Sequence, residues 1–145
     1  QVTAGDGSVR LWDASSCAHT WTFNGAPSAE YYAKFAPSGK LIAVQTLNGG
    51  RSLKLIDPES GKELASILGH DSEILHGQFT FDGKRFVTGS DSMVKVWDFA
   101  TGQELLSITP NIGEISALAI SRDGTILAVG AIDGTIRLWR AQPLK

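Results

Sequence analysis

Cysteine is nearly absent from this chain of 145 residues, because Cys17 is the only one. A single cysteine excludes an internal disulfide and any zinc site built from several cysteines. No apolar stretch approaches the roughly 20 residues that a membrane-spanning helix needs. The first residues also lack the basic and then apolar layout of a signal peptide. We therefore expect a protein of a reducing compartment, the cytoplasm, with no membrane partner.

An excess of one charge is missing too, since 13 basic and 15 acidic residues are mixed along the chain and give a net charge of -2. No basic block of the kind that follows a phosphate backbone is present, so we expect no nucleic acid partner. Apolar residues make up 42% of the chain and charged residues 19%. This balance is typical of a globular chain rather than a disordered one.

An internal repeat is the main feature of the sequence. Three glycines, Gly39, Gly83 and Gly124, precede similar apolar runs and are 44 and 41 residues apart. A second marker is a run of alternating apolar and basic residues that ends in Trp-Asp or a related pair, and its copies are 44, 41 and 42 residues apart. The four copies are Val9–Asp13, Leu53–Asp57, Val94–Asp98 and Ile136–Arg140. Two independent markers therefore share one period.

Each repeat has the pattern of four short strands, and no stretch has a helical period of useful length. The first strand alternates in polarity, as in 114–120, and the second is a nearly unbroken apolar run such as 41–44. An Asp-Gly or Ser-Gly turn joins these two strands. The third strand carries the second marker, and the fourth is 64–68 or 105–108. We expect an all-β chain with repeats at 1–24, which lacks its first strand, 25–66, 67–107, and 108–145, which lacks a clear last strand.

These residues resemble the WD-repeat family, whose signature is a Gly-His pair, four strands and a closing Trp-Asp in about 40–45 residues. The repeat from Gly69-His70 to Trp97-Asp98 matches this signature almost throughout. The resemblance implies a β-propeller with four-stranded antiparallel blades, here an incomplete ring that forms an open arc. It also implies a structural hydrogen-bonded set inside one blade, made of His70, Thr88, Asp91 and Trp97.

The other repeats depart from this pattern. Ala26 stands where the second repeat would have the histidine, and Val129 stands where the last would have the hydroxyl residue. We expect those blades to depend on apolar packing instead. In the opening repeat Cys17 stands where the others have Gly61 and Gly102, so we expect a different turn there.

Catalytic and metal-binding interpretations of the same residues are weaker. His70, Asp91 and Thr88 could form a relay, but nucleophilic catalysis needs an exposed nucleophile and an oxyanion site. The resemblance instead places these groups inside a blade. His70 and His76 lack a third metal ligand. We therefore expect no enzyme activity, no metal site and no cofactor.

Binding residues on a generic scaffold lie in its loops. In the WD-repeat family, the loops that enter the first strand and those that join the second strand to the third face the partners. The candidate partner-binding residues in these loops are Tyr31, Arg51, Glu73, Leu75, Ile112, Glu114 and Ile132. We therefore predict a non-catalytic interaction scaffold for protein or peptide partners.

Two alternative functions stay open at this point. One is a regulatory or sensor repeat region of a longer multidomain enzyme such as a kinase or protease, and the less favoured one is a propeller enzyme. An open arc would also leave apolar faces and strand edges bare. We therefore expect self-association, or completion by the rest of a longer chain.

Overall fold

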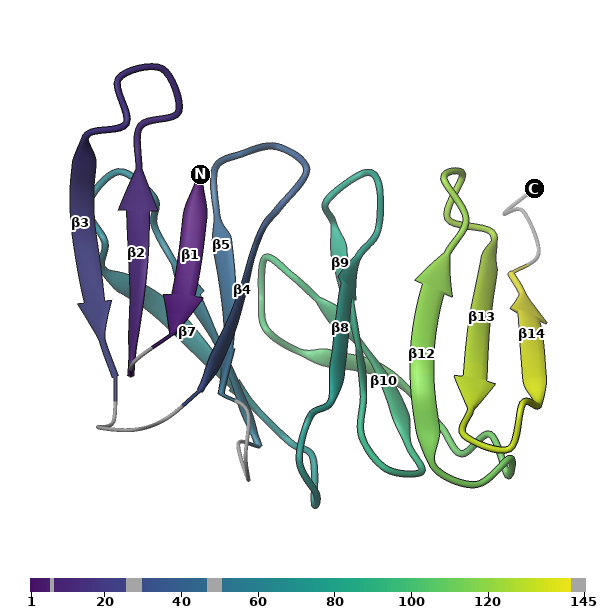
Figure 1. Ribbon diagram of the computed structural model, residues 1–145. Helices are drawn as coiled ribbons and strands as arrows, with labels where there is room; N and C mark the ends of the chain where they lie inside the picture. The colour runs from purple at the N-terminus through teal and green to yellow at the C-terminus, as the bar shows by residue number, and fades with distance from the viewer. Residues whose placement is uncertain (6, 26–29, 47–50, 142–145) are drawn as a thin grey trace. The chain divides into compact units, whose positions relative to one another are not determined.

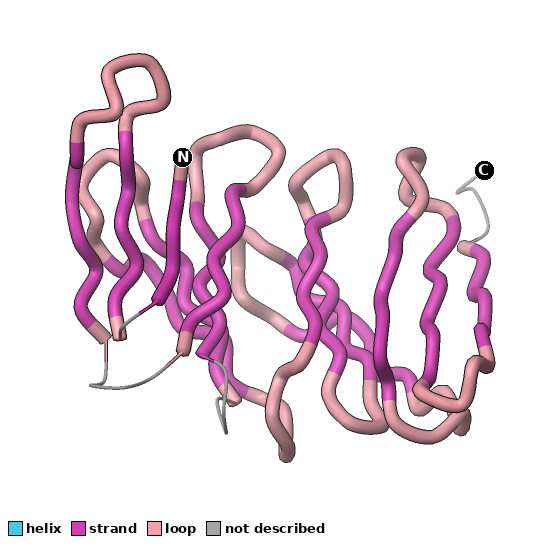
Figure 2. The backbone as a smooth tube through the Cα atoms, viewed as in Figure 1, coloured by secondary structure: helices cyan, strands magenta, loops and turns pink. Residues whose placement is uncertain are grey.

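The computed structural model describes residues 1–5, 7–25, 30–46 and 51–141. Within these ranges the chain forms β-strands and loops and no helix (Figure 1, Figure 2). The strands are β1 (Val2–Gly5), β2 (Ser8–Trp12), β3 (His19–Asn24), β4 (Tyr31–Phe35), β5 (Ile42–Thr46), β6 (Ser52–Ile56), β7 (Glu63–Leu68), β8 (His76–Phe79), β9 (Arg85–Gly89), β10 (Val94–Asp98), β11 (Glu104–Ile108), β12 (Ile115–Ile120), β13 (Ile126–Ala131) and β14 (Ile136–Arg140). The predicted all-β class is confirmed.

Strands that follow one another in sequence pair antiparallel and form four sheets. The sheets β4-β5-β6-β7 and β8-β9-β10-β11 have four strands each. In the described part of the chain, β1-β2-β3 and β12-β13-β14 have three. Within the described residues, β1 is the first strand of the first sheet and β14 is the last strand of the last sheet.

Burial is deepest in the second and third strands of the four-stranded sheets. Ile42 and Val44 on β5 are fully buried, and Phe86 and Val87 on β9 are nearly so. The fourth strand β11 is largely exposed. The second strands β5 and β9 are therefore covered on both faces, which is what an unbroken apolar run predicts.

A register shift recurs where the third strand of a repeat meets the fourth. It lies at Leu11–Trp12, Leu55–Ile56 and Val96–Trp97. An extra residue on one strand of an antiparallel pair bends the strand and increases its local twist. The residue at the tryptophan position is therefore placed in the same way in three sheets.

Two compact units make up the chain, Gln1–Glu73 and Ile74–Lys145. Each has its own apolar core, to which both of its sheets contribute. The core of the first unit contains Val9, Leu11, Tyr31, Ile42, Val44 and Ile56. The core of the second contains Val87, Val94, Ile112, Ile115, Val129 and Ala131.

Candidate functional site

A buried hydrogen bond joins two members of the predicted structural set. Trp97 Nε1 donates to Thr88 Oγ1 at 2.7 Å. The two side chains meet because Thr88 on β9 pairs with Lys95 on β10, two residues before Trp97. Thr88 is fully buried and Trp97 is 2% exposed. A buried donor that loses its acceptor costs about 1–3 kcal/mol, so this bond holds the indole ring within its sheet.

The other two members of the set lie in different environments. His70 is buried. Asp91 is exposed in the turn between β9 and β10, where its backbone carbonyl accepts the amide of Ile115 at 2.9 Å. The part that His70 and Asp91 take in the set stays a prediction.

The same tryptophan bond occurs in the first sheet, where the sequence analysis did not expect it. Trp12 Nε1 donates to Thr3 Oγ1 at 2.9 Å. Thr3 pairs with Arg10, again two residues before the tryptophan. The spacing of the two residues is the signal in the sequence. Thr3 stands nine residues before Trp12, and Thr88 stands nine residues before Trp97.

An aspartate accepts the hydrogen bonds of the turn between the third and fourth strands. In the first sheet, Asp13 Oδ1 accepts from the amides and hydroxyls of Ser15 and Ser16. The Ser15 hydroxyl contributes most to lowering the pKa of the Asp13 carboxyl. At Asp98 the pKa is also lowered, chiefly by the Thr101 amide. The three aspartates in this role are Asp13, Asp57 and Asp98.

The backbone of the first of these turns matches the other two, so the prediction of a different turn at Cys17 was wrong. Cys17 has a φ of 57°, close to 70° at Gly61 and 71° at Gly102. The turn also closes in the same way, because the Asp13 amide donates to the carbonyl of Ala18 at 2.9 Å. Cysteine here occupies the left-handed region, which favours glycine.

Three loops of the second unit are joined by backbone hydrogen bonds. The Ile115 amide donates to the Asp91 carbonyl at 2.9 Å, and the Ile132 amide donates to the Glu114 carbonyl at 3.0 Å. The side chain of Ile132 is 68% exposed, and those of Asp91 and Glu114 are exposed as well. The structure therefore brings two of the candidate partner-binding residues, Glu114 and Ile132, to one surface.

The remaining candidates are distributed between core and surface. Tyr31 belongs to the core of the first unit, where its ring lies over Gly25 and edge-on to Phe23. Ile112 is buried in the core of the second unit. Burial assigns these two side chains to packing rather than to a binding surface. Of the others, Arg51 is exposed, and Glu73 and Leu75 are partly exposed.

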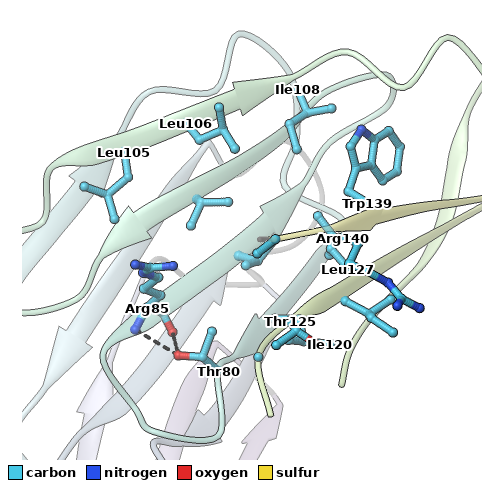
Figure 3. Close-up of a pocket in the computed structure, with 15 residues that line it drawn as sticks. Thr80, Arg85, Leu105, Leu106, Ile108, Ile120, Thr125, Leu127, Trp139 and Arg140 are labelled. Atoms are coloured by element: carbon cyan, nitrogen blue, oxygen red, sulfur yellow. Dashed lines mark hydrogen bonds between the residues drawn. The ribbon is translucent and has the colours of Figure 1, made fainter. Parts of the chain in front are cut away.

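An apolar groove of about 550 Å³ lies in the second unit between β11 and the hairpin of β13 and β14 (Figure 3). Leu105, Leu106 and Ile108 line it from β11, and Leu127 and Trp139 line it from the hairpin. Leu105 and Leu106 are each about half exposed. The sequence pattern predicts a strand for the two leucines but gives no sign of the groove beside them.

In the described ranges, no three side chains of His, Cys, Asp or Glu gather in a group that could hold a metal ion. No helix of that part of the chain is long and apolar enough to cross a membrane. The joined loops expose polar groups, and the groove exposes apolar side chains.

Comparison with known proteins agrees with the repeat. A family model described as WD domain, G-beta repeat matches residues 61–98 and 102–140, more than half of the chain. U3 small nucleolar RNA-associated protein 12 of Saccharomyces cerevisiae is 31% identical, and the match covers 99% of this chain and 17% of that protein. Serine-threonine kinase receptor-associated protein of Bos taurus is 30% identical, and the match covers 96% of this chain and 39% of that protein. The chain spans well under half the length of these relatives. Its repeat spacing, its four-stranded sheets and these matches show that the chain belongs to the WD-repeat family.

Proposed function

We propose that this chain is a non-catalytic protein–protein interaction scaffold that presents the loops of its blades to a protein or peptide partner. The observation that carries the proposal is the pair of backbone hydrogen bonds at Ile115 and Ile132, which join three loops of the second unit. Ile132 offers an exposed apolar contact, and the carboxylates of Asp91 and Glu114 are exposed on the joined loops. A preformed loop surface loses less conformational entropy on binding than a mobile one.

Charge on these loops favours a cationic partner. Residues 89–93, 109–116 and 131–136 contain no lysine or arginine, whereas Asp91, Glu114 and Asp133 contribute carboxylates. Several carboxylates on one surface increase the association rate of a positively charged partner through long-range attraction. One relative's name associates it with a small nucleolar RNA. Direct contact of these loops with a phosphate backbone would bring like charges together, so we propose a protein partner here and no nucleic acid.

The test is charge reversal on the loops. A partner is captured from an extract of the source cell and identified, and its binding kinetics are measured with the chain and with a Glu114→Lys variant. We expect the association rate and its dependence on salt to fall, while stability changes little. Ile132→Asp should weaken binding through faster dissociation, because it removes the apolar contact.

The matched control is Glu59→Lys, an exposed glutamate in the turn between β6 and β7. The charge changes by the same amount as in the loop variant, but the residue lies in a turn between the third and fourth strands. Glu59→Lys should therefore leave the association rate unchanged. An association rate that Glu114→Lys leaves intact would contradict a role for these loops.

Two finer points remain proposals. Because the chain spans 17% and 39% of two relatives, a regulatory or sensor repeat region within a longer multidomain enzyme is a second candidate function.

A cytoplasmic location is supported by the single cysteine, which the structure leaves as a free, exposed thiol. Imaging of the full-length protein with a fluorescent tag would test that location.

A further inference from the structure

The turns between the first and second strands of a sheet share one backbone in this chain. The amide of Gly83 donates to the carbonyl of Thr80 in the β8–β9 turn, at 2.9 Å. The amide of Gly124 donates to the carbonyl of Ser121 in the β12–β13 turn, also at 2.9 Å. The corresponding turn of the first unit closes with the same bond at Gly39. These turns are therefore fixed supports, and they differ in the side chains that they carry.

Two arginines distinguish the turns of the second unit. Two residues after the turn glycine, Arg85 stands where the other turns have Leu41 and Ile126. Two residues before the turn glycine, Arg122 stands where the first unit has Pro37. Both arginines are exposed, and within the described residues neither guanidinium takes part in a hydrogen bond or an ion pair. The bonds that build the turns therefore give no reason for either cation.

The two arginines line one pocket of about 230 Å³ between the β8–β9 turn and the β12–β13 turn. The guanidinium of Arg122 lies over the ring of Phe81, at 4.8 Å from the ring centroid. This contact orients the planar guanidinium, while the residue Phe81 stays 58% exposed. Sites for drug-sized ligands measure roughly 300–1,000 Å³, so this smaller pocket fits a single side chain rather than a nucleotide.

Two aspartates also line the pocket, and the hydrogen bonds of their own turns engage them. Asp82 accepts from the hydroxyl of Thr80 at 2.6 Å and from the amide of Lys84 at 3.0 Å. Asp123 accepts from the hydroxyl of Ser121 and from a turn amide. The two hydroxyls contribute most to lowering the pKa of these carboxyls, which stay ionised. They repel a phosphate with two charges more strongly than a carboxylate with one, so the lining favours a carboxylate ligand.

We propose that the pocket lined by Arg85, Arg122 and Phe81 binds a glutamate or aspartate side chain from an acidic segment of a partner protein. A guanidinium binds a carboxylate through two parallel hydrogen bonds, and Phe81 offers an apolar contact to the residue beside it. The two turns lie at the end of their sheets opposite to the loop before β12 and the loop between β13 and β14 (Figure 1). The pocket is thus a second site, for a partner segment of opposite charge, and its failure would leave the loop proposal intact.

The test follows the arginine side chains directly. The isotope-labelled chain is titrated with the peptide acetyl-Gly-Ser-Leu-Glu-Leu-Ser-Gly-amide, whose only charge is one carboxylate, and the Nε–H signals of Arg85 and Arg122 are recorded by NMR. We expect both signals to shift in a saturable way, with one peptide per chain. The same peptide with glutamine in place of glutamate should bind more weakly. Arg85→Gln and Arg122→Gln should each weaken binding about three- to five-fold, as loss of a partly exposed ion pair predicts.

Lys84→Gln is the matched control, because Lys84 is an exposed cation of the same turn that does not line the pocket. It removes one positive charge, as Arg85→Gln does, and should leave the affinity nearly unchanged. Urea unfolding checks that the variants are folded, and a peptide with phosphoserine in place of glutamate compares the two anions. Four results would overturn the proposal: no saturable shift, equal affinity for the glutamate and glutamine peptides, equal losses for Arg85→Gln and Lys84→Gln, or tighter binding of the phosphoserine peptide.

Discussion

Replacing Cys17 by glycine should stabilise the chain, although the change removes a side chain. Cys17 has a φ of 57° in a turn whose equivalents use glycine. A residue with a Cβ pays about 1–2 kcal/mol to occupy this region. Glycine avoids that cost but loses about 0.5–1 kcal/mol through the greater freedom of the unfolded chain. The free energy of unfolding should therefore rise by about 0.5–1 kcal/mol, which corresponds to about 2–3 °C in the melting temperature of a chain of this size.

Urea unfolding followed by circular dichroism measures this change, and two variants control it. Cys17→Ala removes the thiol but keeps the Cβ, so it should leave stability within about 0.5 kcal/mol of the parent chain. Gly102→Ala makes the opposite exchange at a φ of 71° and should cost about 1 kcal/mol. If Gly102→Ala destabilises while Cys17→Gly does not stabilise, the strain argument for the first turn is refuted.

Two further predictions concern hydrogen bonds of the repeat. Thr88→Val should lower the free energy of unfolding by about 1–3 kcal/mol, because the buried Trp97 indole loses its acceptor. Thr3→Val should lower it by less than about 1 kcal/mol, because water reaches the exposed bond of Trp12. Equal losses for the two variants in urea unfolding would contradict this difference. Because the pKa of Asp98 is lowered, its carboxylate stabilises the fold at a pH above the usual value of 3.8, and this contribution is lost as the pH falls below that value. Asp98→Asn should therefore make the free energy of unfolding fall less steeply with pH in that range. Equal slopes of unfolding free energy against pH for the two proteins would argue against the turn bonds.

The strands and their pairing could be predicted because two markers of the sequence repeat with one period. An apolar run such as 41–44 is compatible with a buried strand, and the glycine before it favours a tight turn. The period then fixes the order of strands in every repeat, so the same interpretation is tested several times within one chain.

The turn at Cys17 could not be predicted from residue type alone. Cysteine lacks the conformational freedom of glycine, which suggested a different turn. In the structure, the bonds from Ser15 and Ser16 to Asp13 and the closing bond to Ala18 hold the backbone in the shared form. Several hydrogen bonds together outweigh the preference of a single residue, and their aspartate is visible in the sequence at Asp13, Asp57 and Asp98.

Burial of the candidate binding residues depends on contacts that the period does not encode. Tyr31 begins β4, and alternation along a strand leaves open which face its first residue takes. The answer comes from Gly25, whose missing side chain leaves room for the Tyr31 ring. Ile112 likewise turns inward to the core, while Ile132, in another predicted partner-facing loop, is exposed. Membership in a loop therefore predicts the end of the blade at which a residue lies but not whether it faces solvent.

Departures from the repeat carry more information about binding than the repeat itself. A residue that every copy shares, such as the turn aspartate, is explained by the hydrogen bonds that it makes in its own turn. Arg140 stands where the other three sheets have that aspartate, and it has no such explanation within its sheet. Its side chain lines the groove of Figure 3, together with Leu106 and Trp139. The groove is therefore lined by a residue that departs from the turn shared by the other repeats, and it is a better place to look for binding than the shared turns are.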